Sequence, residues 1–288
     1  MKTLYVYADF DWLKETEFVG ELGYEFLRGS DSYCFTFSDE WLKKHGDLFL
    51  SDDLNNYPGQ QYTQPEKDIF GCFSDLLPDR WGRTLLLQRE QITAMEEKRS
   101  VRRLSSFDFL TGIDDFSRMG AFRFKESKDG GFINVSESLK IPPLTDIREL
   151  IAASAEIEKS EEGNVLPDKK WVAQLVQPGS SLGGARPKAS VIDTDKTLYV
   201  AKFPSRKDDY DAGLWEHFSH LLAIKAGINA AKTKVLATGE KYHTLLSQRF
   251  DRTQEGKRIH FASAMTLLGL NDSDNATTGH GYLDIVDF

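Results

Sequence analysis

Short β-rich stretches open the chain, the first with alternating apolar and polar positions, and predict a small antiparallel sheet. They occupy residues 4–10, 19–26 and 33–37, with turn residues at 29–31 between the last two. A further strand is expected at 121–125. Together these stretches predict strands of one sheet in the first half of the chain.

Helical periodicity appears after the polar loop 51–65. Apolar residues recur at helical spacing within 70–98 and predict a helix of about 18 residues, with Pro78 suited to its first turn. A shorter helix is expected at 105–110. We therefore expect the first half to mix strands and helices.

Pro142 and Pro143 interrupt the chain and place the best boundary near residue 140. We expect an N-terminal subdomain over 1–140 and a second unit over 141–288. The second unit is predicted to contain, in order, helices at 145–161 and 168–176, strands at 187–193 and 197–203, a helix at 214–226, strands at 232–238 and 243–247, and a helix at 262–268. This succession predicts an α+β fold.

Composition limits the classes of function. The 288 residues are 40% hydrophobic and 28% charged, which is typical of a globular protein, and the net charge of −9 argues against direct nucleic-acid binding. No apolar run is long enough for a membrane span, and acidic residues interrupt the N-terminal apolar run, so no signal peptide is expected. Cys34 and Cys72 fit neither a disulfide framework nor a zinc site and are expected to be buried thiols in a cytoplasmic protein.

The Gly-rich turn at 179–184 contains small, flexible residues that would let backbone N–H groups approach phosphate oxygens. It is not a Walker A loop, because Ala185 stands where lysine is required and a strand follows instead of a helix. Taken by itself, the turn favours the interpretation of an ordinary solvent-exposed turn.

The elements after the turn favour the phosphate interpretation. Lys202 lies within an apolar strand, where a lone charge needs a partner, and Glu216 lies near the start of the next helix. A kinase nucleotide lobe has the same order of elements: a loop, a strand, a strand with a lysine, a helix with a glutamate and two further strands. The alternative is that Lys202 extends from an edge strand into solvent and Glu216 is an ordinary surface residue.

Several segments together resemble the HipA-like serine/threonine kinases, which are toxins of bacterial toxin–antitoxin pairs. They are FSDLLPDRWGR in the first half and SSLGGARPKA, VAKFP, WEHFSHLLAIKAGI and QRFDR in the second. The resemblance implies an N-terminal subdomain followed by a protein-kinase-like nucleotide lobe. It also implies that Ser181, with Ser180 as the neighbouring alternative, is an autophosphorylated serine whose modification silences the kinase.

The resemblance assigns nucleotide contact to specific positions. These are Ser180, Ser181, Gly183, Gly184, Ala185, Lys202, Glu216, Gln248 and Phe250. Gln248 stands where the family usually has an acidic residue before the RFDR sequence. Its amide still forms hydrogen bonds, so adenine contact at this hinge remains the expectation.

The family's catalytic Asp and its Mg²⁺ ligands are expected beyond the end of this chain, so no catalytic or metal-binding residue is assigned within it. The acidic segment 271–275 is expected to be a solvated loop. ATP and Mg²⁺ are the implied cofactors, and residues 1–288 are expected to be inactive alone.

The implied partners are a small helix-turn-helix antitoxin and a protein substrate in the translation machinery, with no membrane contact. The rival hypothesis is a non-catalytic module that binds a nucleotide or an antitoxin.

Overall fold

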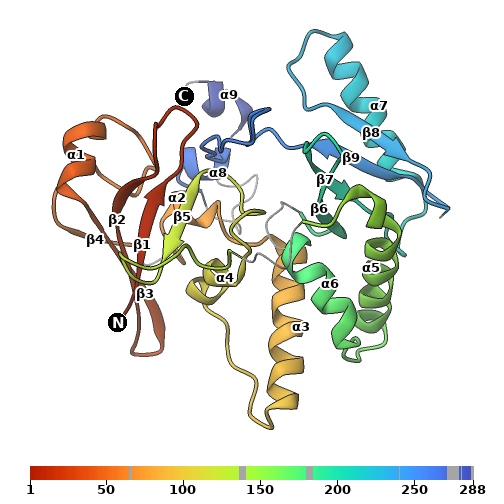
Figure 1. Ribbon diagram of the computed structural model, residues 1–288, viewed down its shortest axis with the longest axis horizontal. Helices are drawn as coiled ribbons and strands as arrows, with labels where there is room; N and C mark the ends of the chain where they lie inside the picture. The colour runs from red at the N-terminus through yellow and green to blue at the C-terminus, as the bar shows by residue number, and fades with distance from the viewer. Residues whose placement is uncertain are drawn as a thin grey trace.

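Two antiparallel sheets lie on opposite sides of a central group of helices in the computed structural model (Figure 1). The structure describes residues 1–64, 67–135, 141–179, 184–239, 241–270, 279 and 281–286. Helices account for 32% and strands for 23% of the chain, so the predicted α+β class is confirmed. The expected boundary near residue 140 lies outside the described residues and stays a prediction.

The first sheet has the strand order β4-β3-β2-β1-β5. Its strands are β1 (Lys2–Ala8), β2 (Glu17–Leu27), β3 (Ser30–Phe37), β4 (Gln60–Tyr62) and β5 (Phe122–Lys125). Alternate residues of β1 are buried, as the alternation predicts. The expectation of a continuous loop over 51–65 was wrong, because β4 pairs with β3 there. Gln61 is buried in β4, and its amide bonds the backbone of Asn55, which compensates for its polarity.

Four helices belong to the first half: α1 (Asp39–His45), α2 (Gly71–Ser74), α3 (Arg80–Glu96) and α4 (Ser106–Gly112). Pro78 was expected in the first turn of a helix, and this was wrong. It precedes the N-cap residue Asp79, whose carboxylate accepts the Gly82 N–H at 2.7 Å. The first helical residue of α3 is therefore Arg80, and Pro78 lies outside the helix. The predicted helix at 105–110 is α4, which has a capping box between Ser105 and Asp108.

The second half begins with the 3₁₀ turn η1 (Leu144–Asp146) and the helices α5 (Ile147–Glu162) and α6 (Lys169–Gly179). The sheet order is then β6-β7-β9-β8. These strands are β6 (Lys188–Ile192), β7 (Leu198–Lys202), β8 (Thr233–Leu236) and β9 (Thr244–Gln248), with α7 (Ala212–Lys225) between β7 and β8. Short helices α8 (Ala264–Leu267) and α9 (Tyr282–Val286) follow, α8 being shorter than the predicted 262–268.

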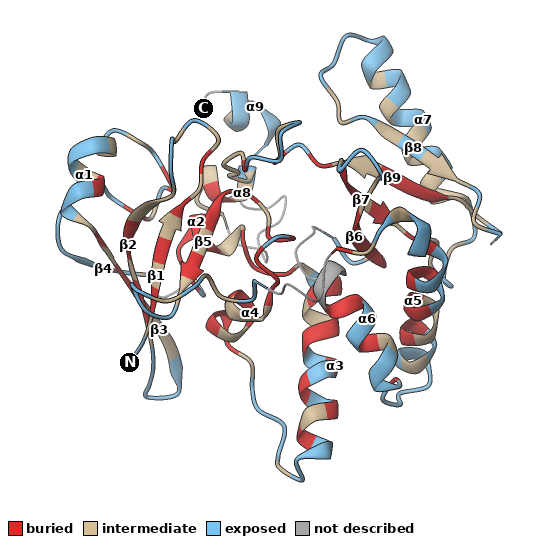
Figure 2. Cartoon of the chain, in the orientation of Figure 1, coloured by how far each residue is buried: buried red, intermediate tan, exposed pale blue. Residues whose placement is uncertain are grey.

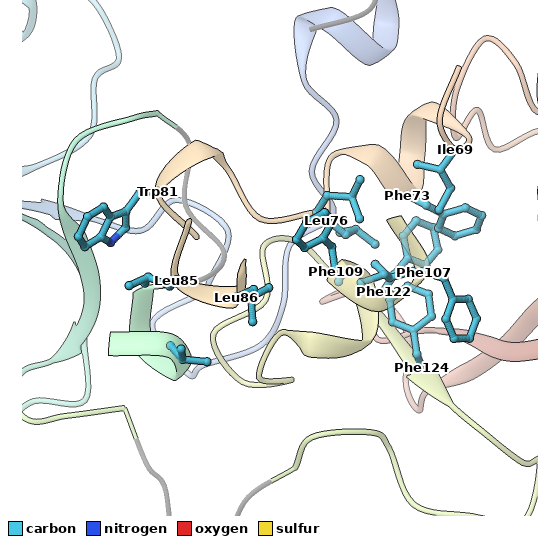
Figure 3. Packing of buried hydrophobic residues seen from close by; sticks show 14 of the residues in the cluster. Ile69, Phe73, Leu76, Trp81, Leu85, Leu86, Phe107, Phe109, Phe122 and Phe124 are labelled. Carbon is cyan, nitrogen blue, oxygen red and sulfur yellow. The ribbon is translucent and has the colours of Figure 1, made fainter. Parts of the chain in front are cut away.

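One hydrophobic cluster joins both halves of the molecule. Figure 2 shows that α3 carries alternating buried and exposed positions, as an amphipathic helix between two layers should. At one end of the cluster, Phe73 packs against Phe122 and Phe124 of β5 in the first sheet, and toward the second sheet lie Leu85 and Trp81 (Figure 3). Both halves therefore hold each other in place through buried apolar contacts.

Both cysteines are buried free thiols, as predicted, and burial raises the pKa of Cys72. In the described part of the chain, no helix combines the length and the apolar character that a membrane crossing requires.

Candidate nucleotide-binding site

Lys202 and Glu216 form the ion pair that the order of elements predicts. Lys202 ends β7, and its Nζ lies 2.6 Å from Oε1 of Glu216 in the second turn of α7. Both side chains are about one third exposed, at 31% and 37%. The pair is thus confirmed, and its ammonium group remains accessible to an anion. Its role toward a nucleotide stays a prediction.

Local sequence features bring α7 close to the sheet. Asp211 caps the helix by accepting the Leu214 N–H at 3.1 Å and also accepts the His243 N–H at 3.2 Å, just before β9. At Gly213, a Cβ atom would lie 2.5 Å from the carbonyl oxygen of His243, so only glycine permits this approach. Burial raises the pKa of Asp211, but its hydrogen bonds to His243 and Leu214 outweigh this and lower it.

The Gly-rich turn enters the described structure at its last residues. Gly184 and Ala185 are exposed, and Gly184 has a φ of 106°, a backbone conformation that favours glycine. The other residues assigned to this turn, Ser180, Ser181 and Gly183, lie outside the described residues. The structure therefore places the exit of the turn beside β6.

Sequence reasoning missed a second lysine on this sheet. Lys188 begins β6 directly opposite Lys202, and it is only 1% exposed. Its Nζ lies 2.7 Å from Oδ2 of Asp79 and donates to the carbonyl oxygen of Gly184 at 2.9 Å. Burial lowers the pKa of Lys188, and Lys202 lowers it further, while Asp79 opposes both effects. The signal was present, because Lys188, like Lys202, is a lone charge in an apolar strand.

A third cation, Arg186, lies between the turn and β6 and pairs with Asp208. Arg186, Lys188 and Lys202 follow the exit of the turn, and each has its own carboxylate partner. None of these three cations is therefore left as an unpaired charge beside the turn.

The residues of the expected adenine hinge lie at the end of β9 and just beyond it. Gln248 ends β9, and its N–H donates to the carbonyl oxygen of Lys232 at 2.8 Å, so this donor is already used. Phe250 is 60% exposed and its ring lies near that of Phe261. Both residues thus lie near the end of β9, and their contact with a base stays a prediction.

The charged residues of the RFDR sequence are directed toward the first half of the protein. Arg249 donates to the carbonyl oxygens of Ser117 at 2.7 Å and Arg118 at 3.1 Å. Asp251 accepts the Gly120 N–H at 2.9 Å and pairs with Arg249 and Arg252. Burial lowers the pKa of Arg252 to about 9. This buried network anchors the end of β9 to the loop 114–120, a role that the sequence pattern did not reveal.

Two family models match the chain. The HipA N-terminal domain matches residues 12–111, and the HipA-like C-terminal domain matches residues 180–288. The chain belongs to the HipA-like family. No curated protein gives a significant match to it.

In the described part of this HipA-like protein, metal-binding side chains do not gather into one cluster. Within this part of the chain, no group of three or more histidine, cysteine, aspartate or glutamate side chains could hold a metal ion. The acidic segment 271–275 lies outside the described residues. His217 and His220, spaced to share a metal, instead contact Thr233 Oγ1 and the carbonyl oxygen of Ala231. Magnesium ligands are therefore not assigned.

A cavity of about 1140 Å³ lies elsewhere in the HipA-like protein. Its walls include Phe10, Leu13, Ile192 and Arg258 and none of the predicted nucleotide-binding residues. The candidate nucleotide site is instead the open surface formed by the exit of the Gly-rich turn, β7 and α7.

Proposed function

We propose that this HipA-like protein provides the nucleotide-binding lobe of an ATP-dependent serine/threonine kinase toxin. The proposal rests chiefly on the 2.6 Å pair between Lys202 and Glu216. In protein kinases, a strand lysine holds nucleotide phosphates while a helix glutamate fixes its orientation. The lysine here follows a Gly-rich turn and precedes the helix, which is the same order.

The charges beside the turn support ATP as the ligand. Lys202 keeps an accessible ammonium group, and the 40% exposed side chain of Arg186 lies along the same segment, whereas Lys188 is buried against Asp79. Phosphate oxygens are the ligands that such donors favour. Among the described residues, no three His, Cys, Asp or Glu side chains come together as metal ligands.

Family membership supports a toxin–antitoxin partnership. We propose that the partner is a small helix-turn-helix antitoxin, that the substrate belongs to the translation machinery of the cytoplasm, and that Ser181 is the regulatory phosphorylation site. These assignments follow from the resemblance of the motifs.

Calorimetric titration with MgATP tests the nucleotide assignment. Lys202→Ala should weaken binding roughly 10- to 100-fold. A hydrogen bond to a charged group contributes about 1.5–3 kcal/mol, and its loss corresponds to a change of this size in affinity. Lys234→Ala is the matched control. Lys234 pairs with Asp193 at 3.1 Å at the other end of the same sheet, so its removal changes net charge equally without touching Lys202. Equal affinities in the two variants would contradict the proposal.

A further inference from the structure

The N-terminal end of α3 makes a buried junction with the segment that leaves the Gly-rich turn. Residues 79–82 and 184–188 are about a hundred positions apart in the sequence, yet hydrogen bonds join them directly. This junction connects the first half of the protein to the candidate phosphate site.

Lys188 is the centre of the junction. Its ammonium group, with the side chain only 2% exposed, contacts the Asp79 carboxylate at 2.7 Å and the Gly184 carbonyl oxygen at 2.9 Å. A buried ammonium group is unfavourable without such partners. The ion pair therefore fixes where the Gly184 carbonyl group can lie.

Asp79 is held by α3 itself. While Oδ2 binds Lys188, Oδ1 accepts the Gly82 N–H at 2.7 Å, and the positive end of the helix dipole favours the carboxylate. The acceptor for Lys188 is thus attached to a 17-residue helix packed in the core. Burial raises the pKa of Asp79, and Lys188 opposes that effect.

Trp81 completes the junction from the first turn of α3. Its indole N–H donates to the carbonyl oxygen of Lys188 at 3.0 Å, and its backbone N–H donates to that of Gly184 at 3.4 Å. The Gly184 carbonyl group consequently receives two hydrogen bonds from groups that α3 holds in place.

We propose that Asp79 and Lys188 are positioning residues that fix the exit of the Gly-rich turn relative to Lys202. The inference rests on the proposed phosphate-binding role of that turn. Lys188 and Lys202 lie directly opposite each other on neighbouring strands. A contact that fixes Gly184 relative to Lys188 therefore also fixes Gly184 relative to Lys202. Releasing Gly184 would allow the turn to move away from the phosphates, and misplacement by about 1 Å can cost on the order of 100-fold in a positioned site.

Lys188→Met, together with the double variant Asp79→Asn/Lys188→Met, tests the inference. The double variant leaves no buried charge unpaired, so it is expected to fold even where the single variant does not. Lys67→Met is the matched control. Lys67 pairs with Asp53 at 3.3 Å, both side chains are at most 9% exposed, and Asp53 accepts the Gly71 N–H at the start of α2. The control thus breaks an equivalent buried pair away from the turn.

Two measurements decide the outcome. Hydrogen–deuterium exchange at the amides of residues 184–186 and 188 should become about tenfold faster in the Lys188 variants and stay unchanged in the control. MgATP binding should weaken about tenfold in the same variants only. Unchanged exchange in the folded double variant would overturn the inference, as would faster exchange with unchanged affinity. If the parent protein does not bind ATP, the proposed function fails, while the exchange result alone still decides whether the pair fixes Gly184.

Discussion

Arg249→Met should strongly destabilise the HipA-like protein, because Arg249 joins the end of β9 to the first half. Its side chain is 1% exposed and donates to both Asp251 oxygens at 2.8 and 2.6 Å as well as to the carbonyl oxygens of Ser117 and Arg118. Methionine fills similar space but provides no donor. The variant therefore removes one hydrogen bond from each of these two carbonyl groups, and the Arg118 carbonyl keeps the bond from Arg252 at 2.9 Å.

The magnitude follows from the groups that remain. Breaking a buried ion pair by removing one partner costs about 3–5 kcal/mol. Asp251 retains Arg252 and the Gly120 N–H, so the charge itself is not left alone. We therefore expect a loss near 3 kcal/mol in the free energy of unfolding, a large share of the roughly 5–15 kcal/mol typical of folded proteins.

Urea unfolding followed by tryptophan fluorescence measures this loss. Arg206→Met is the control, because Arg206 pairs with Glu162 at 3.5 Å, both side chains are at least 40% exposed, and exposed pairs contribute about 0–1 kcal/mol. A difference between the two variants below about 0.5 kcal/mol, within the usual range for surface substitutions, would refute the view that Arg249 anchors β9.

Two further changes test other parts of the molecule. Burial lowers the pKa of His260 to about 4, and among the described residues its Nδ1 has no hydrogen-bond partner. The folded protein therefore favours the neutral imidazole. The contribution of His260 to the free energy of unfolding is fully present above about pH 6.5 and is lost as the pH falls toward 4. His260→Phe should make the unfolding free energy from urea titrations fall less between pH 7 and 4.5, and an unchanged pH dependence would contradict this. Ser181→Glu should bind MgATP more weakly than Ser181→Ala in calorimetry, because a phosphate or its mimic beside the turn repels the nucleotide phosphates. Equal affinities would exclude that electrostatic effect.

The sequence predicted those elements whose local pattern agrees with their tertiary surroundings. Strand β1 alternates in the sequence and alternates in burial, so its period was sufficient, whereas β2 and β3, which bury runs of two or three consecutive residues, were predicted from their β-rich composition. The polar strand β4 was missed, because its burial depends on the Gln61 amide bonding the Asn55 backbone rather than on apolar residues. Patterns of hydrophobicity cannot report such compensation.

The candidate site divides in the same way. The pair of Lys202 and Glu216 was predictable. A lone charge in an apolar strand needs a partner of opposite charge, and the following helix provides a glutamate. The link from Lys188 to Asp79 was not, because it joins positions more than a hundred residues apart and each residue has a local explanation. Likewise, the RFDR sequence suggested a hinge, yet its charged side chains serve the interface with the loop 114–120.

The sheet order explains why both long-range links bear on the same residue. β7, which carries Lys202, lies between β6 and β9. β6 is tied to α3 through Lys188, and the end of β9 is tied to the first half through Arg249. Lys202 is therefore held in a frame that the first half of the protein supports on both sides.

Glu216 has no comparable support. None of the residues of α7 is buried, and large apolar side chains such as Trp215 and Leu222 are at least 50% exposed on it (Figure 2). Few buried contacts make an element easier to displace. A displacement of α7 would consequently separate Glu216 from Lys202 while leaving the lysine in place, whereas loss of either link to the first half would move the lysine itself.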